Sequence, residues 1–382
     1  MCAEQVGYKC TVMRGGTSRA LFFLEKDLPP KGPERDYVLQ RAMGKPDKFE
    51  IDGLGGGQLG TSKIAIIGPP SIPDADIDYT FVQVLIDHQG VDYQGNCGNI
   101  SAAVGPFAIE AGFVKPVMPE TSLRIHNTNT KSIILARVPT DGGRARIKGD
   151  YAIAGIPGTG AEIALDFRHT VGAKTGKLLP TGKVSEEIHL ESGKSVEVSI
   201  CDAGNPCVFV RAEQIGISGK ELPPEIDRNT SLLKVISEIK GKTAERIGLV
   251  SNWRAADPNT FLPFVAVVAK SADYTTSNGE QVGASAIEFL SRLVILNGCH
   301  PAYAGTGAIC TAACASIPES VPNKLLPSPT EIVRIGHPKG VMPVKSALRE
   351  TTKGSGYEFS FLGFSRTARK IMDGQVYVPS AD

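Results

Sequence analysis

Residues 95–109 read GNCGNISAAVGPFAI and residues 303–317 read YAGTGAICTAACASI, and the two stretches follow one plan. Each begins with a glycine-rich turn, continues through small polar residues and enters an alanine-rich run that predicts a helix. A helix of small apolar residues is thin enough for strands to pack around it. We therefore expect an internal duplication, with one such helix at the centre of each half.

Short runs rich in β-branched residues predict strands at 8–14, 20–24, 63–68, 79–86, 132–138, 195–201, 207–212 and 264–269. Helical patterns are fewer and lie at 33–44, 100–112, 231–248, 284–296 and 307–317. Strands outnumber helices and do not alternate with them one for one, which disfavours a doubly wound α/β fold. The stretch 176–194 is rich in Gly, Pro and charge and is suited to a linker between the halves.

The composition favours a folded protein that acts on a small molecule. The chain has 382 residues, of which 41% are apolar, so a large core is possible. With 41 basic against 40 acidic residues and no basic block, it lacks the charge pattern of a nucleic-acid binder. No apolar run reaches the ~18 residues that span a bilayer, and the N-terminal segment lacks the apolar stretch of a secretory signal. We expect a cytoplasmic protein without a membrane partner.

The segment GGGQLGTSK at 55–63 resembles a phosphate-binding loop only in part. A P-loop requires G-x-x-x-x-G-K-[ST], in which the lysine reaches the phosphates and the following hydroxyl holds magnesium. Gly55 and Gly60 have the required spacing, but the order TSK places the hydroxyls before Lys63. Nucleotide binding is therefore a poor fit. Lys63 is either a solvated residue at the start of an edge strand or, beside a substrate carboxylate, an acid or base.

The turn before the first alanine-rich helix contains Cys97, flanked by glycine and asparagine residues. Unpaired N–H groups and the helix dipole make a helix N-terminus a site for anions, and the same field favours a thiolate. A small buried hydrophobic residue is the alternative interpretation of a cysteine. Two helix starts that face one cleft would hold carboxylates without an arginine clamp, although Arg14 and Arg19 are candidates for one.

The eight cysteines contain no C-x-x-C pair. Cys299, His300, Cys310 and Cys314 could be drawn as a metal site, but the last two lie four residues apart in an alanine-rich run that predicts a buried helix. Small buried thiols are the commoner outcome, so we expect no metal. Further hydroxyls and amides occur in RGGTS at 14–18 and HNTNT at 126–130, where turn chemistry is the alternative to binding.

Taken together, the motifs resemble the PrpF family, which contains 2-methylaconitate cis–trans isomerases, aconitate isomerases and oxalomesaconate tautomerases. The segments that carry the resemblance occur in order along nearly the whole chain: MRGGTSRALFF, GLGGGQLGTSKIAIIG, GNCGNISAAVGPFAIEAG, HNTNT, GIPGTGAEIALDF, TGKLLPTG, DAGNPCVFV and AGTGAICTAA.

This resemblance implies an α+β fold of the diaminopimelate-epimerase-like class, with two pseudo-symmetric domains, each wrapping strands around a central helix. The active site is then expected in the cleft between them. The domains are expected at 1–185, completed by a C-terminal strand at about 365–382, and at 186–364. Epimerases of this fold carry one cysteine per domain; Cys97 matches the first, but Ala304 stands at the second position.

The resemblance pairs Lys63 with Cys97 as the proton-transfer residues. The residues expected to bind substrate are Thr17, Ser18, Asn96, Gly98, Asn99, Asn127, Asn205, Thr306 and Gly307. We expect isomerisation of an unsaturated tricarboxylate such as aconitate by removal and return of an allylic proton, without a cofactor. The alternatives are a racemase or epimerase of the same fold, which Ala304 disfavours, and a non-catalytic carboxylate-binding protein. The sequence leaves a homodimer open.

Overall fold

The computed structural model describes residues 4–87, 89–255, 262–351 and 356–380. Their contacts divide the chain into two compact units. Unit 1 comprises Met1–Leu165 together with Ser365–Asp382, and unit 2 comprises Asp166–Phe364. The chain passes from one unit to the other within two strands, β11 (Ile163–Asp166) and β22 (Tyr357–Arg366).

The main strands of unit 1 are β1 (Gln5–Gly15), β2 (Ser18–Leu24), β3 (Lys63–Gly68), β4 (Ile77–Val84), β6 (Glu120–Asn127) and β7 (Ser132–Asp141). Neighbours along this series pair alternately antiparallel and parallel, beginning with the antiparallel β1–β2 hairpin. Helix α1 (Pro33–Met43) lies between β2 and β3 in sequence, and α2 (Gly98–Glu110) lies between β4 and β6. The shorter strands are β5 (Val91–Asp92), β8 (Arg144–Ala145), β9 (Tyr151–Ala152) and β10 (Thr159–Gly160).

The main strands of unit 2 are β13 (Ser195–Ala203), β14 (Asn205–Arg211), β15 (Phe264–Lys270), β18 (Phe289–Ile295), β20 (Ile332–His337) and β21 (Gly340–Glu350). They pair in the same alternating order as the strands of unit 1. The helices are α3 (Pro223–Asp227), α4 (Thr230–Arg246) and α5 (Gly305–Ser316). The shorter strands are β16 (Tyr274–Thr275), β17 (Gln281–Val282) and β19 (Gly298–Cys299).

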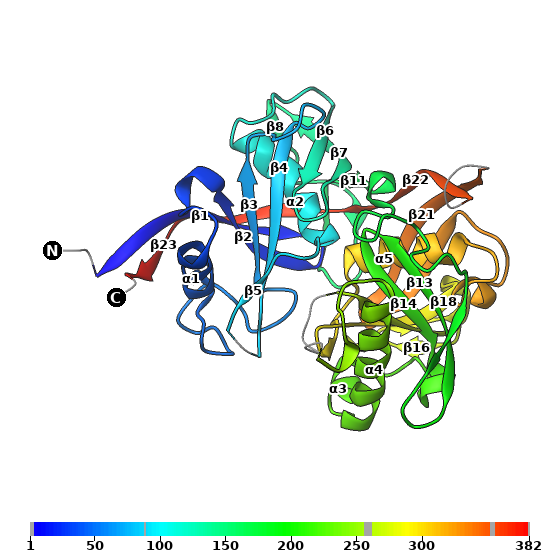
Figure 1. Ribbon diagram of the computed structural model, residues 1–382. Helices are drawn as coiled ribbons and strands as arrows, with labels where there is room; N and C mark the ends of the chain where they lie inside the picture. Colours follow the sequence, from blue (N-terminus) through cyan, green and yellow to red (C-terminus); the bar gives the residue numbers. More distant parts are fainter. Residues whose placement is uncertain (1–3, 88, 256–261, 352–355, 381–382) are drawn as a thin grey trace. The chain divides into compact units, whose positions relative to one another are not determined.

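The identical pairing order confirms the duplication that the two alanine-rich stretches predict (Figure 1). Each repeat is completed by a strand that follows the other repeat in sequence. β23 (Ala368–Pro379) pairs along the whole of β1 in unit 1, and β12 (Glu186–His189) pairs with β13 in unit 2. The predicted α+β class of strands around central helices is therefore observed in each unit.

The central helices α2 and α5 are buried on all sides, as their small residues predict. Every residue of α2 from Gly98 to Ile109 is buried, and so is every residue of α5 from Gly305 to Ala315. Strands approach so closely that side chains are excluded at one glycine in each helix. A Cβ at Gly105 would lie 2.6 Å from Val138, and one at Gly307 would lie 2.5 Å from Leu293.

Two sequence predictions about local structure are wrong. The stretch 284–296 contains no α-helix: residues 284–286 form a short 3-10 helix, and residues 289–295 form β18, whose seven residues are all buried. A strand that is covered on both faces lacks the period of two that marks a half-buried strand, so periodicity alone does not distinguish it from a buried helix. The expected linker at 176–194 contains β12 instead, and the unit boundary falls at 165/166 because Asp202 of β13 binds the segment 172–178 through backbone and side-chain hydrogen bonds.

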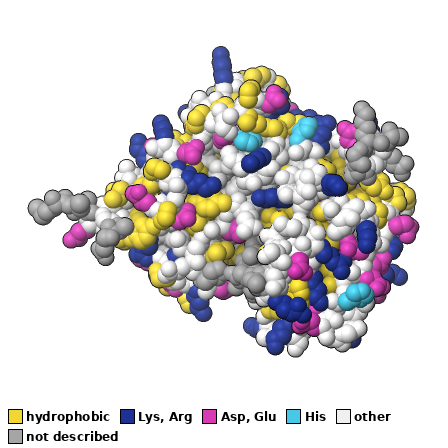
Figure 2. Space-filling view, viewed as in Figure 1, with side chains coloured by type: hydrophobic (Ala, Val, Ile, Leu, Met, Phe, Trp, Pro, Cys, Tyr) yellow, Lys and Arg dark blue, Asp and Glu magenta, His cyan; other side chains and the backbone are white. Residues whose placement is uncertain are grey.

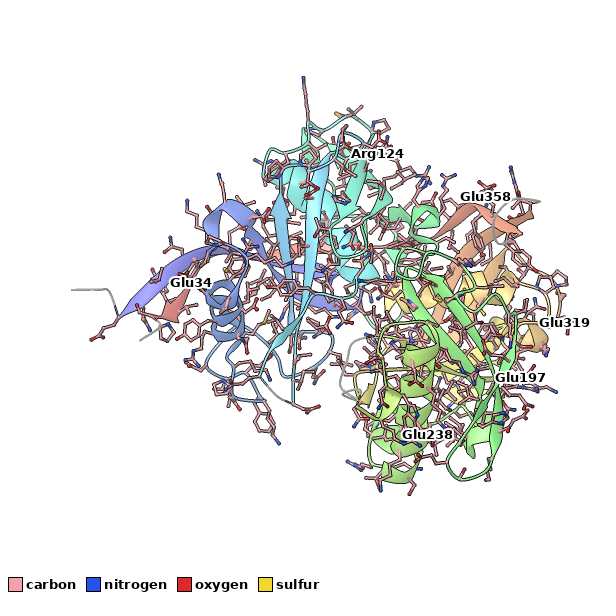
Figure 3. The ribbon with its side chains drawn as sticks, viewed as in Figure 1. Glu34, Arg124, Glu197, Glu238, Glu319 and Glu358 are labelled. Carbon is pink, nitrogen blue, oxygen red and sulfur yellow. The ribbon has the colours of Figure 1, made fainter. Side chains whose placement is uncertain are left out.

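Charged side chains of both signs are interspersed over the face shown in Figure 2. Some form close pairs, as at Glu197 of β13, which is labelled in Figure 3. Its carboxylate accepts hydrogen bonds from Lys324 (2.6 Å) and Arg211 (3.0 Å), and these cations lower the pKa of Glu197 against the effect of burial. Among the helices of the described residues, none is long and apolar enough to cross a membrane.

Candidate active site

The start of α2 and the β1–β2 turn meet in unit 1. Cys97 occupies the N-cap position of α2, is 5% exposed and makes no side-chain capping hydrogen bond. The turn opposite approaches the helix so closely that a Cβ at Gly15 would lie 2.5 Å from the Asn99 carbonyl oxygen. A Cβ at Gly16, whose φ is +50°, would lie 2.2 Å from the Asn99 side chain. Glycine is therefore required at both turn positions.

Lys63, the first residue of β3, faces the same helix. Strand alternation places it with Ala65 on the face that carries Phe22, because β2 and β3 pair in parallel register. The Phe22 ring contacts Phe107 of α2, with ring centroids 5.2 Å apart. Lys63 is 4% exposed, so its ammonium group lies inside unit 1 rather than in solvent. The structure thus excludes the solvated-lysine interpretation.

Three residues of β4 lie along the face that Lys63 shares with α2. The Lys63 Nζ donates a 3.1 Å hydrogen bond to the Gln83 side chain and lies 5.1 Å from the centre of the Phe81 ring. Tyr79 follows on the same face and is fully buried. Burial, together with the neighbouring Cys97, raises the pKa of Tyr79 well above its ordinary value. Lys63 and Cys97 therefore border one buried, largely aromatic face within a single unit.

The glycine-rich loop before Lys63 binds a carboxylate of the protein itself. Glu50 is 2% exposed, and its Oε2 accepts hydrogen bonds from the backbone N–H groups of Gly56 (2.7 Å) and Gly57 (2.8 Å). The same oxygen accepts a 2.7 Å hydrogen bond from the Ser62 hydroxyl. Since Ser62 directly precedes Lys63, Glu50 fixes the start of β3. No sequence pattern indicates this role, because Glu50 lies outside the glycine-rich motif.

The expected substrate-binding residues of unit 1 fall into two groups. Thr17 and Ser18 lie in the turn that meets α2; Ser18 is 3% exposed, and its hydroxyl has no hydrogen-bond partner among the described residues. Asn96 and Gly98 flank Cys97 at the start of α2 and are buried. Asn127, in contrast, is the last residue of β6 and precedes the turn at 128–130.

All four hydrogen-bonding positions of the Asn127 amide are taken by the protein. Its Nδ2 donates to the Tyr79 carbonyl (3.3 Å) and to Asn129 (3.2 Å), and its Oδ1 accepts from the backbone N–H and the hydroxyl of Thr130. This arrangement supports turn chemistry for Asn127, the alternative considered for the HNTNT motif.

The two arginines considered as a carboxylate clamp bind protein carbonyl groups. Arg14 donates to the carbonyl oxygens of Gly16 and Thr367, both at 2.9 Å, and Arg19 donates to Gly55 at 2.9 Å. Arg366, which lies outside the sequence motifs, binds the helix start. It is 5% exposed and donates a 3.0 Å hydrogen bond to Asn99, and burial lowers its pKa to about 10.

Unit 2 repeats the turn-and-helix arrangement without the candidate proton-transfer residues. Asn205, the first residue of β14 after the β13–β14 turn, donates a 2.8 Å hydrogen bond to the hydroxyl of Thr306 at the start of α5. However, the first residue of β15 is Phe264, where β3 has Lys63, and the N-cap of α5 is Ala304, where α2 has Cys97. Only one of the two repeats therefore carries the candidate acid–base pair.

Asp202 supports the turn in unit 2. Its Oδ2 accepts hydrogen bonds from the Lys174 N–H (3.0 Å) and from the N–H (2.7 Å) and hydroxyl (2.8 Å) of Thr175. The other carboxylate oxygen is buried without a hydrogen-bond partner among the described residues. Burial raises the pKa of Asp202 to about 6, against the effect of these hydrogen bonds.

The cysteines of unit 2 are buried thiols. Cys310 and Cys314 of α5 lie near Cys201 and Cys207 of the β13–β14 hairpin, and all four are fully buried. Burial raises the pKa of Cys201 and Cys207. Within the part of the chain that the structure describes, no group of three or more His, Cys, Asp or Glu side chains is placed to hold a metal ion.

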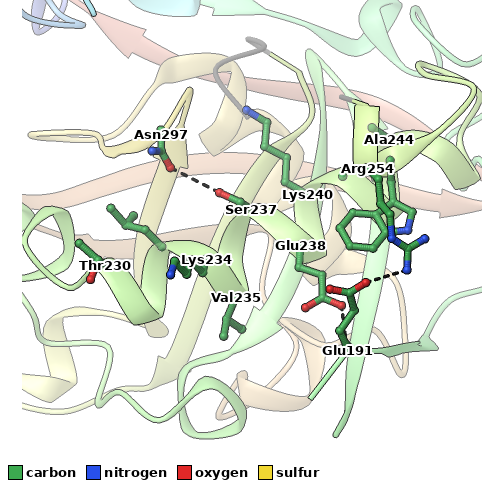
Figure 4. Close-up of a pocket in the computed structure, with 13 residues that line it drawn as sticks. Glu191, Thr230, Lys234, Val235, Ser237, Glu238, Lys240, Ala244, Arg254 and Asn297 are labelled. Atoms are coloured by element: carbon green, nitrogen blue, oxygen red, sulfur yellow. Dashed lines mark hydrogen bonds and ion pairs between the residues drawn. The ribbon is translucent and has the colours of Figure 1, made fainter. Parts of the chain in front are cut away.

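A surface hollow of about 720 Å³ lies along α4 in unit 2 (Figure 4), and Trp253 is among the residues that line it. Glu191, Glu238 and Arg254 point toward one another at its rim, where Arg254 binds Glu191 at 2.6 Å. These rim charges are already paired within the protein. The residues that line this hollow belong to unit 2, whereas Lys63 and Cys97 belong to unit 1.

Comparison with known proteins places the chain among isomerases. A family model described as PrpF protein matches residues 5–379. A 3-methylitaconate isomerase of Eubacterium barkeri is 43% identical over 99% of both chains. A 2-methyl-aconitate isomerase of Cupriavidus necator is 35% identical over 98% of both chains.

Solved structures agree on the fold. A methylitaconate-delta-isomerase structure aligns with a TM-score of 0.79 at 43% identity and covers 99% of this chain and 97% of its own. A probable proline racemase of Agrobacterium radiobacter has a TM-score of 0.56 at 13% identity, over 96% of this chain and 92% of its own, and so shows only a shared fold. Together these structures confirm the epimerase-like α+β fold class.

Proposed function

Because the chain belongs to the PrpF family and is an isomerase, we propose that it shifts an allylic proton in an unsaturated tricarboxylate such as aconitate, without a cofactor. The observation that carries this proposal is the position of Lys63 and Cys97 on one buried face of unit 1, together with their replacement by Phe264 and Ala304 in unit 2. Two unlike groups, one amine and one thiol, suit a reaction in which a proton leaves one carbon and a proton is added to a different carbon.

In the proposed mechanism, one of the two groups takes a proton from the CH₂ next to the double bond. The C–H electron pair enters an allylic anion that extends into a carboxylate. A proton returned to the far carbon moves the double bond, whereas rotation within the anion and return to the first carbon exchanges the cis and trans isomers. A positioned acid or base of this kind contributes roughly 10²- to 10⁴-fold to the rate.

Hydrogen-bond donors near the start of α2 would stabilise the allylic anion. The N–H groups at the start of α2 and the buried Ser18 hydroxyl would bind substrate carboxylates and stabilise charge that develops during the reaction, and the Thr17 hydroxyl would bind a substrate carboxylate. In the glycine-rich loop, the N–H groups of Gly56 and Gly57 do not take this role, because they already bind Glu50.

A dicarboxylate such as 3-methylitaconate is the second candidate substrate, favoured by the 43% identity with an isomerase of that name. A racemase of the same fold is a weaker candidate, since Ala304 leaves the second helix start without a thiol. A carboxylate-binding protein without activity would share the same helix starts.

Proton NMR separates these functions. The protein is mixed in D₂O with cis-aconitate, trans-aconitate or 3-methylitaconate, and the isomer ratio and deuterium content of each are followed. We expect the isomer ratio of at least one acid to change, and neither Lys63→Met nor Cys97→Ser to produce that change at a comparable rate. Unchanged ratios for all three acids, with binding detected by calorimetry, would identify a binding protein instead.

A further inference from the structure

A buried cation contacts the helix start that carries Cys97. Arg366 is 5% exposed, and its Nε donates a 3.0 Å hydrogen bond to the Asn99 Oδ1. Its Nη1 donates to the carbonyl oxygen of Ser365 at 2.8 Å. Asn99, fully buried in the first turn of α2, in turn donates a 3.2 Å hydrogen bond from Nδ2 to the Thr17 hydroxyl oxygen. The three side chains therefore form a line from the interior of unit 1 to the β1–β2 turn.

The guanidinium determines which way the Asn99 amide points. An arginine has five N–H donors and no acceptor, so only the amide oxygen of Asn99 can face it. Rotation of the amide by 180° would set two donors against each other in a buried place, where an unmade hydrogen bond is costly. The Asn99 amide nitrogen must therefore point toward Thr17.

The polarity of the Thr17 hydroxyl follows from this orientation. Because its oxygen accepts the hydrogen bond from Asn99, its own hydrogen must point elsewhere. Thr17 is half-buried, and among the described residues its hydroxyl donates to no protein group. The next residue, Ser18, carries a buried hydroxyl without a hydrogen-bond partner in the same described set.

We propose that Arg366 and Asn99 are positioning residues that hold the Thr17 hydroxyl as a hydrogen-bond donor toward a carboxylate of the substrate. This inference rests on the proposed function, since it assigns the binding of a carboxylate to the same site. Arg366 acts through Asn99, so its charge is used to orient a neutral donor rather than to clamp the ligand.

Unit 2 contains a hydrogen bond of the same direction, from an asparagine amide to a threonine hydroxyl, but the asparagine and the threonine have changed places between hairpin and helix. There the asparagine, Asn205, is the first residue of β14 after the hairpin turn, and the threonine, Thr306, lies at the helix start. The amide nitrogen again donates to the hydroxyl oxygen, at 2.8 Å. An amide that donates to a threonine hydroxyl at both turn-and-helix junctions supports a selected arrangement rather than an incidental contact.

Asn99→Asp tests the proposal because it reverses this polarity without changing shape. One aspartate oxygen would accept from Arg366 and the other from the Thr17 hydroxyl, so that the hydroxyl hydrogen turns inward. We expect the dissociation constant for tricarballylate, a saturated tricarboxylate that cannot isomerise, to rise about tenfold to hundredfold. Thr17→Val should weaken binding as much, whereas Thr17→Ser should stay within about threefold of the wild type. For an isomerised substrate, KM should rise similarly while kcat changes less than about threefold.

The double variant distinguishes orientation from simple repulsion by the new charge. If Asn99→Asp acts through Thr17, adding it to Thr17→Val should weaken tricarballylate binding by less than about threefold more. Thr11→Val, which removes a hydroxyl that donates to Asp373 on the surface, is the matched control and should bind normally. Calorimetry measures each dissociation constant, and thermal unfolding checks that each variant is folded.

Undiminished binding in Thr17→Val would overturn the inference, even if Asn99→Asp fails to fold. Fully additive losses in the double variant would also overturn it, since they would show that the aspartate repels the ligand directly. Normal isomerisation by the wild type in either case would leave the proposed function intact. A wild type that neither binds tricarballylate nor isomerises any of the three unsaturated acids would overturn both.

Discussion

Replacing Lys63 by methionine should remove the activity without destabilising the protein. Lys63 is 4% exposed, and its ammonium group has one hydrogen bond, to Gln83, and one aromatic contact, with Phe81. No carboxylate among the described residues forms an ion pair with it. The protein thus buries a positive charge that only neutral groups compensate.

The expected change in the free energy of unfolding follows from these contacts. Burying an ammonium group costs several kcal/mol. The charged hydrogen bond returns about 1.5–3 kcal/mol, and the aromatic contact returns about 0.5–2 kcal/mol. Methionine fills a similar volume without the charge, although the Gln83 oxygen loses its donor at a cost of about 1 kcal/mol. The Lys63→Met protein should therefore be as stable as the wild type or more stable by about 1–2 kcal/mol.

Urea unfolding followed by circular dichroism measures the stability, and proton NMR with the best unsaturated acid measures turnover. Turnover should fall about 10²- to 10⁴-fold. Lys240→Met is the matched control, because Lys240 is also buried (3% exposed) but binds the carbonyl oxygen of Leu296 in unit 2. Its turnover should stay within about threefold of the wild type. A Lys63→Met protein that loses more than about 2 kcal/mol, or that keeps wild-type turnover, would refute the reasoning.

Three further outcomes can be measured with the same assays. Cys97→Ser should bind tricarballylate within about threefold of the wild type, because shape and hydrogen bonding persist, but should lose about 10²- to 10⁴-fold in turnover; wild-type turnover would exclude the thiol from proton transfer. Glu50→Ala should lose about 2–4 kcal/mol in urea unfolding, since it leaves the buried Ser62 hydroxyl without its acceptor, and Glu50→Gln should lose less; equal losses would show that charge, not hydrogen bonding, holds the loop. Burial raises the Asp202 pKa to about 6, so the folded protein keeps a proton that the unfolded chain releases above about pH 4. The stability of the wild type relative to Asp202→Asn should therefore fall by about 2.5 kcal/mol from pH 4 to pH 7, and a constant difference would contradict this assignment.

The sequence predicted the duplication and the central helices because both depend on local composition. A run of small residues after a glycine turn allows close packing on every side, and α2 and α5 are buried accordingly. The strand β18 was predicted as a helix because its partners on both sides come from distant segments, which periodicity does not reveal. The linker prediction at 176–194 failed for a similar reason, since β12 is fixed by its pairing with β13.

The candidate site was predicted less completely than the fold. Motif spacing indicated Lys63, Cys97 and the turn residues, and the resemblance to the PrpF family paired the first two. Neither the motif spacing nor the family resemblance indicated Glu50 or Arg366. Each of them lies outside the motif whose residue it binds, Ser62 for Glu50 and Asn99 for Arg366. A buried charge that orients a neutral group leaves no local pattern, so only the folded structure reveals it.

Ribosomal synthesis delivers β23 only after all of unit 2 has emerged, although β23 belongs to unit 1. Until then, β1 lacks its longest partner, and Val376 and Val378 are missing from the core that they share with α1. Unit 2 is continuous from residue 166 to residue 364 and can fold earlier. Lys63 and Cys97 belong to the unit that is completed later. A nascent chain should therefore have no isomerase activity until β23 pairs with β1. Truncated translation products that lack β23 should be inactive as well.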